Sequence, residues 1–201
     1  MKKILSLLIC IANISISQNI FQTDSINQLT EINATYYAQH QTPITHQNIK
    51  LEDIQKKSIG QEPAFIFANT PSIIAYADGG HSQGYSYFTL RGIDQTRINI
   101  TLDGVPLNDP ADQAFYFSNY ADILNSISKI QIQRGVGVSK NGNASYAGSI
   151  ELFSPQLNNN NKEIGIGYGS YNTLRAYGTY NTILNNKSLH LRVSQIYSDG
   201  F

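Results

Sequence analysis

The sequence predicts an α+β unit, with a small mixed β-sheet and short helices, followed by a run of antiparallel strands. Three observations support this fold class. Residues 88–153 consist of short alternating strands cut by glycine-containing turns, and two helix-start patterns come before them. A third pattern, of longer alternating strands, begins after residue 162. Two short helices that precede a small mixed sheet fit an α+β unit.

The first 17 residues have the layout of a secretory signal peptide. Residues 1–3 are positively charged, residues 4–16 are largely apolar, and small residues suited to cleavage precede Gln18. The apolar run is too short for a spanning helix. A lipoprotein reading of Cys10, the only cysteine, is the alternative, although the bulky Ile9 before it does not suit lipid modification. Cleavage before Gln18 leaves a mature chain without a thiol, and therefore without a disulfide.

Composition and motifs argue against several classes of function. The chain balances 14 Lys and Arg against 14 Asp and Glu, whereas a nucleic-acid partner would need a basic stripe. The sequence contains no Gly-x-Ser-x-Gly, no His-Glu-x-x-His and no phosphate loop, and the glycines of residues 165–169 break the dinucleotide pattern at Ser170. Its four histidines are scattered rather than set at metal-ligand spacing. The sequence therefore predicts no enzyme, no resident cofactor and no metal.

Two short helices are predicted before the sheet. Asn48 can cap a helix over about residues 49–57, with Leu51 and Ile54 facing inward. A second helix is predicted from Glu62-Pro63 to about residue 68, because proline is favoured as the first helical residue. Residues 71–74 then lead into the sheet.

Three short strands follow, at residues 97–103, 129–134 and 149–154. In the first, Ile98, Ile100 and Leu102 fall on one face and polar residues on the other, which is the pattern of a half-buried strand. Asp103-Gly104 then supplies a turn that tolerates positive φ. Together these strands form a small sheet with an unusually high polar content.

The order of motifs in this region resembles the plug domain of TonB-dependent outer-membrane receptors. The motifs are LRG, RINITLDGVPLND, ISKIQIQRG and a glycine-rich segment that closes on GSIELFSP, and they cover roughly residues 29–155. The resemblance implies a signal peptide at 1–17, a flexible N-terminal segment at 18–42, a plug domain at 43–155, a linker at 156–162 and barrel strands at 163–201. Val136 stands where the family has proline, and NASYAGS lacks adjacent glycines, which leaves the local turn geometry open.

The C-terminal strands have the pattern of an outer-membrane barrel. Residues 188–197 place Leu189, Leu191 and Val193 on one face and His190, Arg192 and Ser194 on the other, and residues 163–168 and 174–180 alternate similarly. Five tyrosines form an interfacial girdle or are ordinary sheet aromatics: Tyr168, Tyr171, Tyr177, Tyr180 and Tyr197. A plugged barrel needs about 22 strands, or about 220 residues in strands. The sequence is therefore expected to be an N-terminal fragment that ends in a truncated transmembrane β-barrel.

The resemblance implies an energy-coupling partner. The place of the TonB box, which binds TonB of the inner-membrane energy-coupling complex, falls on seven residues: Leu29, Thr30, Glu31, Ile32, Asn33, Ala34 and Thr35. Such a segment binds by pairing its backbone with an exposed sheet edge, so few side chains are prescribed. It departs from the valine-rich form of the family, and a linker without a role is the alternative.

The resemblance also implies a lock between plug and barrel. Arg91 and Arg134 match the two plug arginines that are expected to pair with glutamates on the barrel wall. Removing one partner of such a pair costs about 3 to 5 kcal/mol when the pair is fully buried. The alternative is a pair of turn-flanking arginines at a sheet surface. The expected plug turns contain Gly92, Asp103, Gly104 and Gly135.

Two long loops supply candidate substrate contacts, because outward plug loops form the floor of the substrate site in this family. The candidates are His81, Gln83, Asp109, Asp112, Gln113 and Tyr116. A solvated loop histidine is the alternative for His81. The predicted function is TonB-dependent import of a ferric siderophore or other iron complex, across the outer membrane of a Gram-negative bacterium and in contact with its lipid. Haem, cobalamin or glycan import, and a non-transporting surface protein of the same architecture, stay open.

Overall fold

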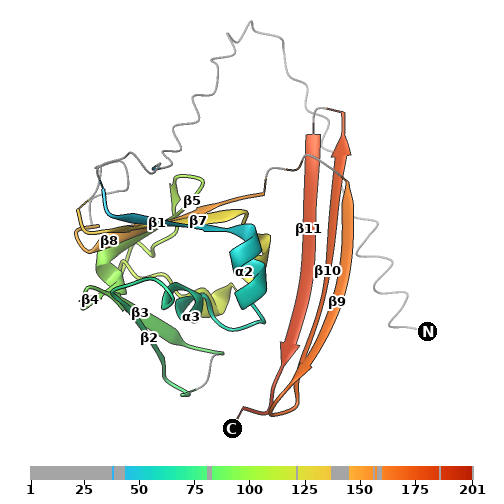
Figure 1. Ribbon diagram of the computed structural model, residues 1–201, viewed down its shortest axis with the longest axis horizontal. Coiled ribbons are helices and arrows are strands. Elements are labelled where there is room, and N and C mark those ends of the chain that lie inside the picture. Colours follow the sequence, from blue (N-terminus) through green and yellow to red (C-terminus); the bar gives the residue numbers. More distant parts are fainter. Residues whose placement is uncertain are drawn as a thin grey trace, which may run out of the picture. The chain divides into compact units, whose positions relative to one another are not determined.

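The computed structural model describes residue 38 and residues 44–80, 83–120, 122–136, 145–155, 157, 160–185 and 187–200. The chain divides into two compact units, Met1–Asn33 and Ala34–Phe201, and all the described residues belong to the second unit. They form three sheets with short helices (Figure 1). The predicted signal peptide and the segment of residues 29–35 lie outside the described residues.

The central element is a five-stranded mixed sheet in the order β1-β7-β8-β5-β6. Its strands are β1 (His46–Lys50), β5 (Ile98–Leu102), β6 (Val105–Pro106), β7 (Lys129–Arg134) and β8 (Gly148–Phe153). Strands β5 and β8 are parallel, and the other neighbours are antiparallel. The three predicted strands are thus the three central strands of this sheet. Asp103 (φ 49°) and Gly104 (φ 82°) form the turn between β5 and β6, where both residues need a left-handed backbone.

One face of this sheet packs into the hydrophobic core. Ile132, Ile150 and Ile100 are aligned across β7, β8 and β5, and all three are fully buried. Helices α2 (Leu51–Lys57) and α3 (Pro63–Phe67) contribute to the same core through Ile54 and Phe67. Burial of each such side chain stabilises the fold by about 1.5 to 3 kcal/mol. Within the described ranges, none of the helices has the length and apolar character to cross a membrane.

The opposite face of the sheet is polar, and it is also buried. Gln131, Gln133 and Glu151 are each less than 5% exposed. The Gln131 amide donates to the carbonyl of Ala38 at 3.1 Å and accepts from the N–H of Ala38 at 3.1 Å. The sequence pattern predicts a half-buried sheet, but this face is covered as well. The side-chain amides provide the hydrogen bonds that buried backbone requires.

A second sheet contains β2 (Ile73–Ala77), β3 (Ser86–Leu90) and β4 (Ile93–Asp94), in that order. The β2 and β3 strands form an antiparallel hairpin. Three short 3-10 helices follow along the chain: η1 (Gln95–Arg97), η2 (Phe117–Asn119) and η3 (Ile123–Ser126). The ring of Phe88 in β3 packs against Phe67 and Phe117, with centroids 5.6 Å and 6.4 Å away. These aromatic contacts join the hairpin to α3 and η2.

The third sheet is an antiparallel meander of β9 (Asn161–Gly169), β10 (Thr173–Leu184) and β11 (Lys187–Tyr197). Leu189, Leu191 and Val193 are exposed on one face, and Arg192 points to the other and is largely buried. The predicted fold class, an α+β unit followed by antiparallel strands, is confirmed. Strand β9 begins at Asn161, earlier than the predicted start at residue 163.

One helix boundary differs from the prediction. Asn48 does not cap a helix but lies in β1, where its side chain donates to the Ala38 carbonyl and accepts from Gln131. Helix α2 begins at Leu51, and Lys50 precedes it without a capping side-chain hydrogen bond. The prediction was wrong because the capping amide is used in contacts with residues distant in sequence, which override a local preference.

Candidate functional site

Asp122 is the centre of the most strongly bonded charged cluster in the described residues. It lies between η2 and η3, with a left-handed backbone (φ 62°, ψ 15°) and a side chain that is 2% exposed. Aspartate is one of the few residues other than glycine that adopt this conformation at small cost. The turn therefore presents a buried carboxylate that needs a positive partner.

Two arginines of the three-stranded sheet supply that charge. Arg175 of β10 binds Oδ1 of Asp122 through Nη2 at 2.7 Å, and Arg192 of β11 binds Oδ2 through Nη2 at 2.6 Å. Nε of Arg192 also donates to Oδ2 at 3.1 Å, and the amide of Asn125 donates to Oδ1 at 2.6 Å. These four hydrogen bonds use the acceptor capacity of an ionised carboxylate. The arginine side chains are 13% and 9% exposed, so the cluster is buried on both sides.

Tyr177 holds the two arginines side by side. The guanidinium of Arg175 lies 4.8 Å from the centre of the Tyr177 ring, and that of Arg192 lies 4.5 Å from it. The Tyr177 hydroxyl donates to Glu163 at 2.8 Å, which fixes the ring. The ring lies over Gly165, its partner across β9 and β10, where a side chain would collide with it. Glycine at residue 165 therefore makes room for the ring that supports both arginines.

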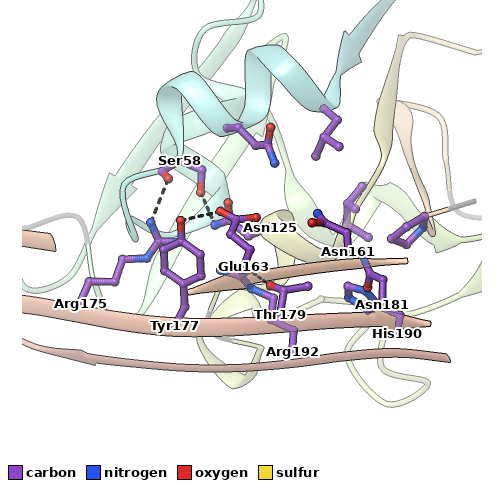
Figure 2. Close-up of a pocket in the computed structure, with 14 residues that line it drawn as sticks. Ser58, Asn125, Asn161, Glu163, Arg175, Tyr177, Thr179, Asn181, His190 and Arg192 are labelled. Atoms are coloured by element: carbon purple, nitrogen blue, oxygen red, sulfur yellow. Dashed lines mark hydrogen bonds between the residues drawn. The ribbon is translucent and has the colours of Figure 1, made fainter. Parts of the chain in front are cut away.

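This cluster lines a cavity of about 410 Å³ between the α+β unit and the three-stranded sheet (Figure 2). Figure 2 shows Arg175, Tyr177 and Arg192 pointing from the strands toward Ser58 and Asn125. Arg175 donates to the carbonyl of Ser58 at 3.4 Å, at the end of α2. The sheet is thus joined to the α+β unit both by charge and by a backbone contact.

The two predicted lock arginines meet elsewhere. Arg91 and Arg134 line a second cavity, of about 380 Å³, together with Gly135. Arg134 donates to the carbonyl of Pro71 at 3.5 Å, and its Nε is buried without a hydrogen-bond partner among the described residues. In the described part of the chain neither arginine forms an ion pair. The structure therefore places both arginines in the wall of one cavity, and within the described residues neither has a glutamate partner.

The predicted turn residues adopt the backbone that the turns need. Gly92 and Gly135 have φ values of 77° and 93°, and Arg91 before Gly92 has a φ of 54°. Asp103 in the β5–β6 turn accepts the N–H of Ser154 at 3.0 Å, so this turn is also tied to the end of β8.

Four of the six substrate candidates lie together in the loop of residues 108–120. Asp112 accepts from the Tyr116 hydroxyl at 2.6 Å and from the N–H of Ala114 at 2.8 Å, and these bonds lower the pKa of Asp112. The hydrogen bond between Tyr116 and Asp112 also raises the pKa of Tyr116, to about 12. The backbone N–H of Gln113 donates to the backbone carbonyl of Asp109 at 2.8 Å. Gln83 lies in the other loop, and His81 lies outside the described residues.

The part of the chain that the structure describes holds no group of three or more His, Cys, Asp or Glu residues that could bind a metal ion. The polar side chains of the loop of residues 108–120 are bonded to one another and to the backbone of the same loop.

Comparisons with known proteins identify the architecture. The family model described as TonB-dependent Receptor Plug Domain matches residues 38–149, more than half of the chain. The chain belongs to this plug-domain family. No curated protein sequence matches it. Because the family consists of receptors, membership agrees with the lack of catalytic motifs in the sequence.

Solved structures with a similar fold include three whose names refer to metal transport. The ferric-catecholate import receptor Fiu of E. coli K12 has a TM-score of 0.60 at 18% identity, and the match covers 78% of this chain and 22% of Fiu. The copper transporter OprC has a TM-score of 0.62 at 16% identity, covering 77% of this chain and 24% of OprC. The ferric citrate transporter FecA has a TM-score of 0.57 at 17% identity, with coverages of 76% and 25%. The chain thus spans about a quarter of the length of these structures.

Sequence reasoning missed two residues that organise the plug. Asp122 was not singled out, although Arg192 on the polar face of a predicted strand was a sign that a negative partner was needed. Asn108 accepts the N–H of Ile100 at 2.7 Å and donates to the carbonyls of Ile98 and Gln113, at 3.0 Å and 2.7 Å. Asn108 therefore ties the candidate substrate loop to the edge of β5.

Proposed function

We propose that this plug domain belongs to an outer-membrane receptor of a Gram-negative bacterium that imports a scarce nutrient by TonB-dependent active transport. The observation that carries the proposal is the attachment of the plug to β9–β11, which we call the wall strands, through Asp122, Arg175 and Arg192. These strands turn charged and polar residues toward the plug and expose apolar residues on the other face. That division suits strands with lipid on one side and a plugged lumen on the other.

The proposed substrate is a ferric siderophore or another iron complex. Support comes from solved structures with a similar fold, several of which are named as receptors or transporters of ferric complexes or copper. Asp109, Asp112, Gln113 and Tyr116, which share one loop, are proposed to contact it together with Gln83 and His81. Import of haem, cobalamin or glycan by the same machinery is a separate outcome of the growth test described below.

Arg91 and Arg134 are proposed to pair with glutamates of the barrel wall. Their guanidinium groups line one cavity, and a buried arginine nitrogen without a partner supports this role. A guanidinium enclosed in a lumen needs a carboxylate, and the bidentate geometry of such pairs fixes orientation as well as distance. This lock would act in addition to the Asp122 cluster. In the lock the plug supplies the arginines and the wall the carboxylates, whereas in the cluster the plug supplies the carboxylate and the wall strands the arginines.

Residues 29–35 are proposed to bind TonB in the periplasm after substrate binds the plug loops. A ligand can drive such a release only when it binds the released state more tightly than the resting state. A peptide of residues 25–40 should bind the periplasmic domain of TonB, measured by calorimetry. A peptide with the same composition in scrambled order serves as the control, and equal binding of the two would reject the TonB-box role.

Growth on defined iron sources tests the function as a whole. A strain that lacks the receptor should fail to grow on the transported iron complex under iron limitation, and the full-length gene should restore growth. A receptor that lacks residues 29–35 should still bind the complex but should not support growth. Equal growth with and without this segment would favour the non-transporting surface protein.

A further inference from the structure

One face of the β2–β3 hairpin presents aromatic side chains to solvent. Tyr76 and Tyr87 are directly paired across the two strands, and their rings stack with centroids 5.4 Å apart. Tyr85 precedes β3 and is 58% exposed, and Tyr76 is 48% exposed. Phe88 and Leu90 alternate with Tyr87 and point into the core, so the strand geometry leaves the tyrosines outside.

The loop of residues 108–120 extends this aromatic surface. Tyr120 is 50% exposed and stacks on Phe115 with centroids 5.1 Å apart. Phe117 of the same loop packs against Phe88 of β3, with centroids 6.4 Å apart, so the loop lies beside the hairpin. We refer to the five tyrosines of the hairpin and the loop as the tyrosine patch: Tyr76, Tyr85, Tyr87, Tyr116 and Tyr120.

The carboxylates bonded within the patch are negative, whereas Arg175 and Arg192 lie on Asp122, two residues after Tyr120. Tyr87 donates its hydroxyl hydrogen to Asp78 at 3.2 Å, and Tyr116 donates to Asp112 at 2.6 Å. Residues 72–90 and 104–128 contain no lysine or arginine. Arg91 follows the base of the hairpin. The four residue steps from Arg91 back to Tyr87 in β3 span about 13 Å. Because the Debye length is about 8 Å at physiological ionic strength, this arginine does not neutralise the patch.

The hydrogen bonds also fix which groups the patch offers a ligand. Two hydroxyls already donate to carboxylates, so their remaining capacity is as acceptors. The faces of the rings carry negative quadrupole density and attract cations. Around Tyr87 and Tyr116 the patch therefore presents acceptors, aromatic faces and negative charge.

We infer that the tyrosine patch is the floor of the substrate site and selects a neutral or cationic ligand that carries hydrogen-bond donors, while it disfavours polyanionic chelates. This inference rests on the proposed function and specifies its substrate class. Among iron complexes it favours a ferric hydroxamate that bears an ammonium group over ferric citrate or a ferric tris-catecholate.

Calorimetric binding to the purified full-length receptor tests the inference with two probes, an ammonium-bearing ferric trihydroxamate and a ferric tris-catecholate. The cationic chelate should bind about tenfold more tightly, a preference that should shrink as salt is added. Tyr76→Leu should weaken its binding about two- to fivefold, and Tyr76→Phe should not. Asp112→Asn should weaken binding of the cationic chelate alone. Asp53→Asn, which removes an equal charge from exposed α2, serves as the matched control.

Tighter or equal binding of the tris-catecholate would overturn the inference, as would the absence of binding by the cationic chelate. Unchanged binding in both Tyr76→Leu and Asp112→Asn would overturn it too. The proposed function fails separately: if the cationic chelate binds as expected but supports no TonB-dependent growth, the ligand preference stands and the import proposal falls. If the tris-catecholate alone supports TonB-dependent growth, the import proposal stands and the ligand preference falls.

Discussion

Replacement of Asp122 by asparagine should loosen the plug from the wall strands. Asparagine keeps the left-handed turn and nearly the same shape, so the variant removes mainly the negative charge. Arg175 and Arg192 then stay buried without their counter-ion, 13% and 9% exposed. Breaking a buried pair costs about 3 to 5 kcal/mol. We expect about 3 kcal/mol, the low end, because the asparagine carbonyl still accepts one hydrogen bond and Tyr177 still stacks on both arginines.

The assay is urea-induced release of the plug from the full-length receptor in lipid vesicles, followed as the passage of a small solute. Asp122→Asn should shift the release midpoint to lower urea by the equivalent of about 3 kcal/mol. Asp199→Asn is the matched control, because Asp199 accepts hydrogen bonds from Tyr197 and Asn172 near the end of β11 but forms no described ion pair. We expect the release midpoint of this variant to match that of the wild type, because Asp199 is exposed and water screens its charge. Equal midpoints for wild type and Asp122→Asn would refute the role of the cluster.

Three further predictions concern other parts of the plug. Burial and the nearby Asp103 raise the pKa of Glu151 from 4.5 to about 6, so the unfolded chain binds fewer protons and plug stability should fall as pH rises from about 4.5 to about 6. After allowance for solvent screening the loss is about 1 kcal/mol, and Glu151→Gln should abolish this pH dependence in urea titrations. Gln131→Ala removes both hydrogen bonds to the Ala38 peptide, and hydrogen exchange at that N–H should accelerate about tenfold; unchanged exchange would show that other contacts protect it. Arg91→Ala combined with Arg134→Ala in the full-length receptor should increase passage of small solutes, and unchanged passage would remove the proposed lock.

The central strands could be predicted because their signal is local. Ile98, Ile100 and Leu102 alternate with polar residues within one short segment, and the Asp103-Gly104 turn follows directly. The first strand could not be predicted in this way. The segment of residues 46–50 is short and polar. It becomes a strand by pairing with β7, more than 80 residues further along the chain. Local preference instead favoured Asn48 as a helix cap.

The buried polar face and the charged cluster have a similar explanation. Alternation indicates that Gln131 and Glu151 share a face, but it does not say that another part of the chain covers that face. Arg192 was placed on the polar side of its strand, but its partner Asp122 is 70 residues away in sequence and lies in the turn between η2 and η3. Because each partner is supplied by the tertiary fold, neither sequence segment contains enough information to identify the pair.

Cross-linking in intact outer membranes tests most directly whether the plug lies against its own wall strands. Gln55 and Asn181 line the same cavity, one on α2 of the plug and one on β10, and neither belongs to the Asp122 cluster. In the full-length receptor, Gln55→Cys with Asn181→Cys should be joined by a short bifunctional thiol reagent. His46→Cys with Gln133→Cys, paired across β1 and β7, is the control for a folded plug. A control disulfide that forms while the plug–wall pair stays unlinked would contradict the account.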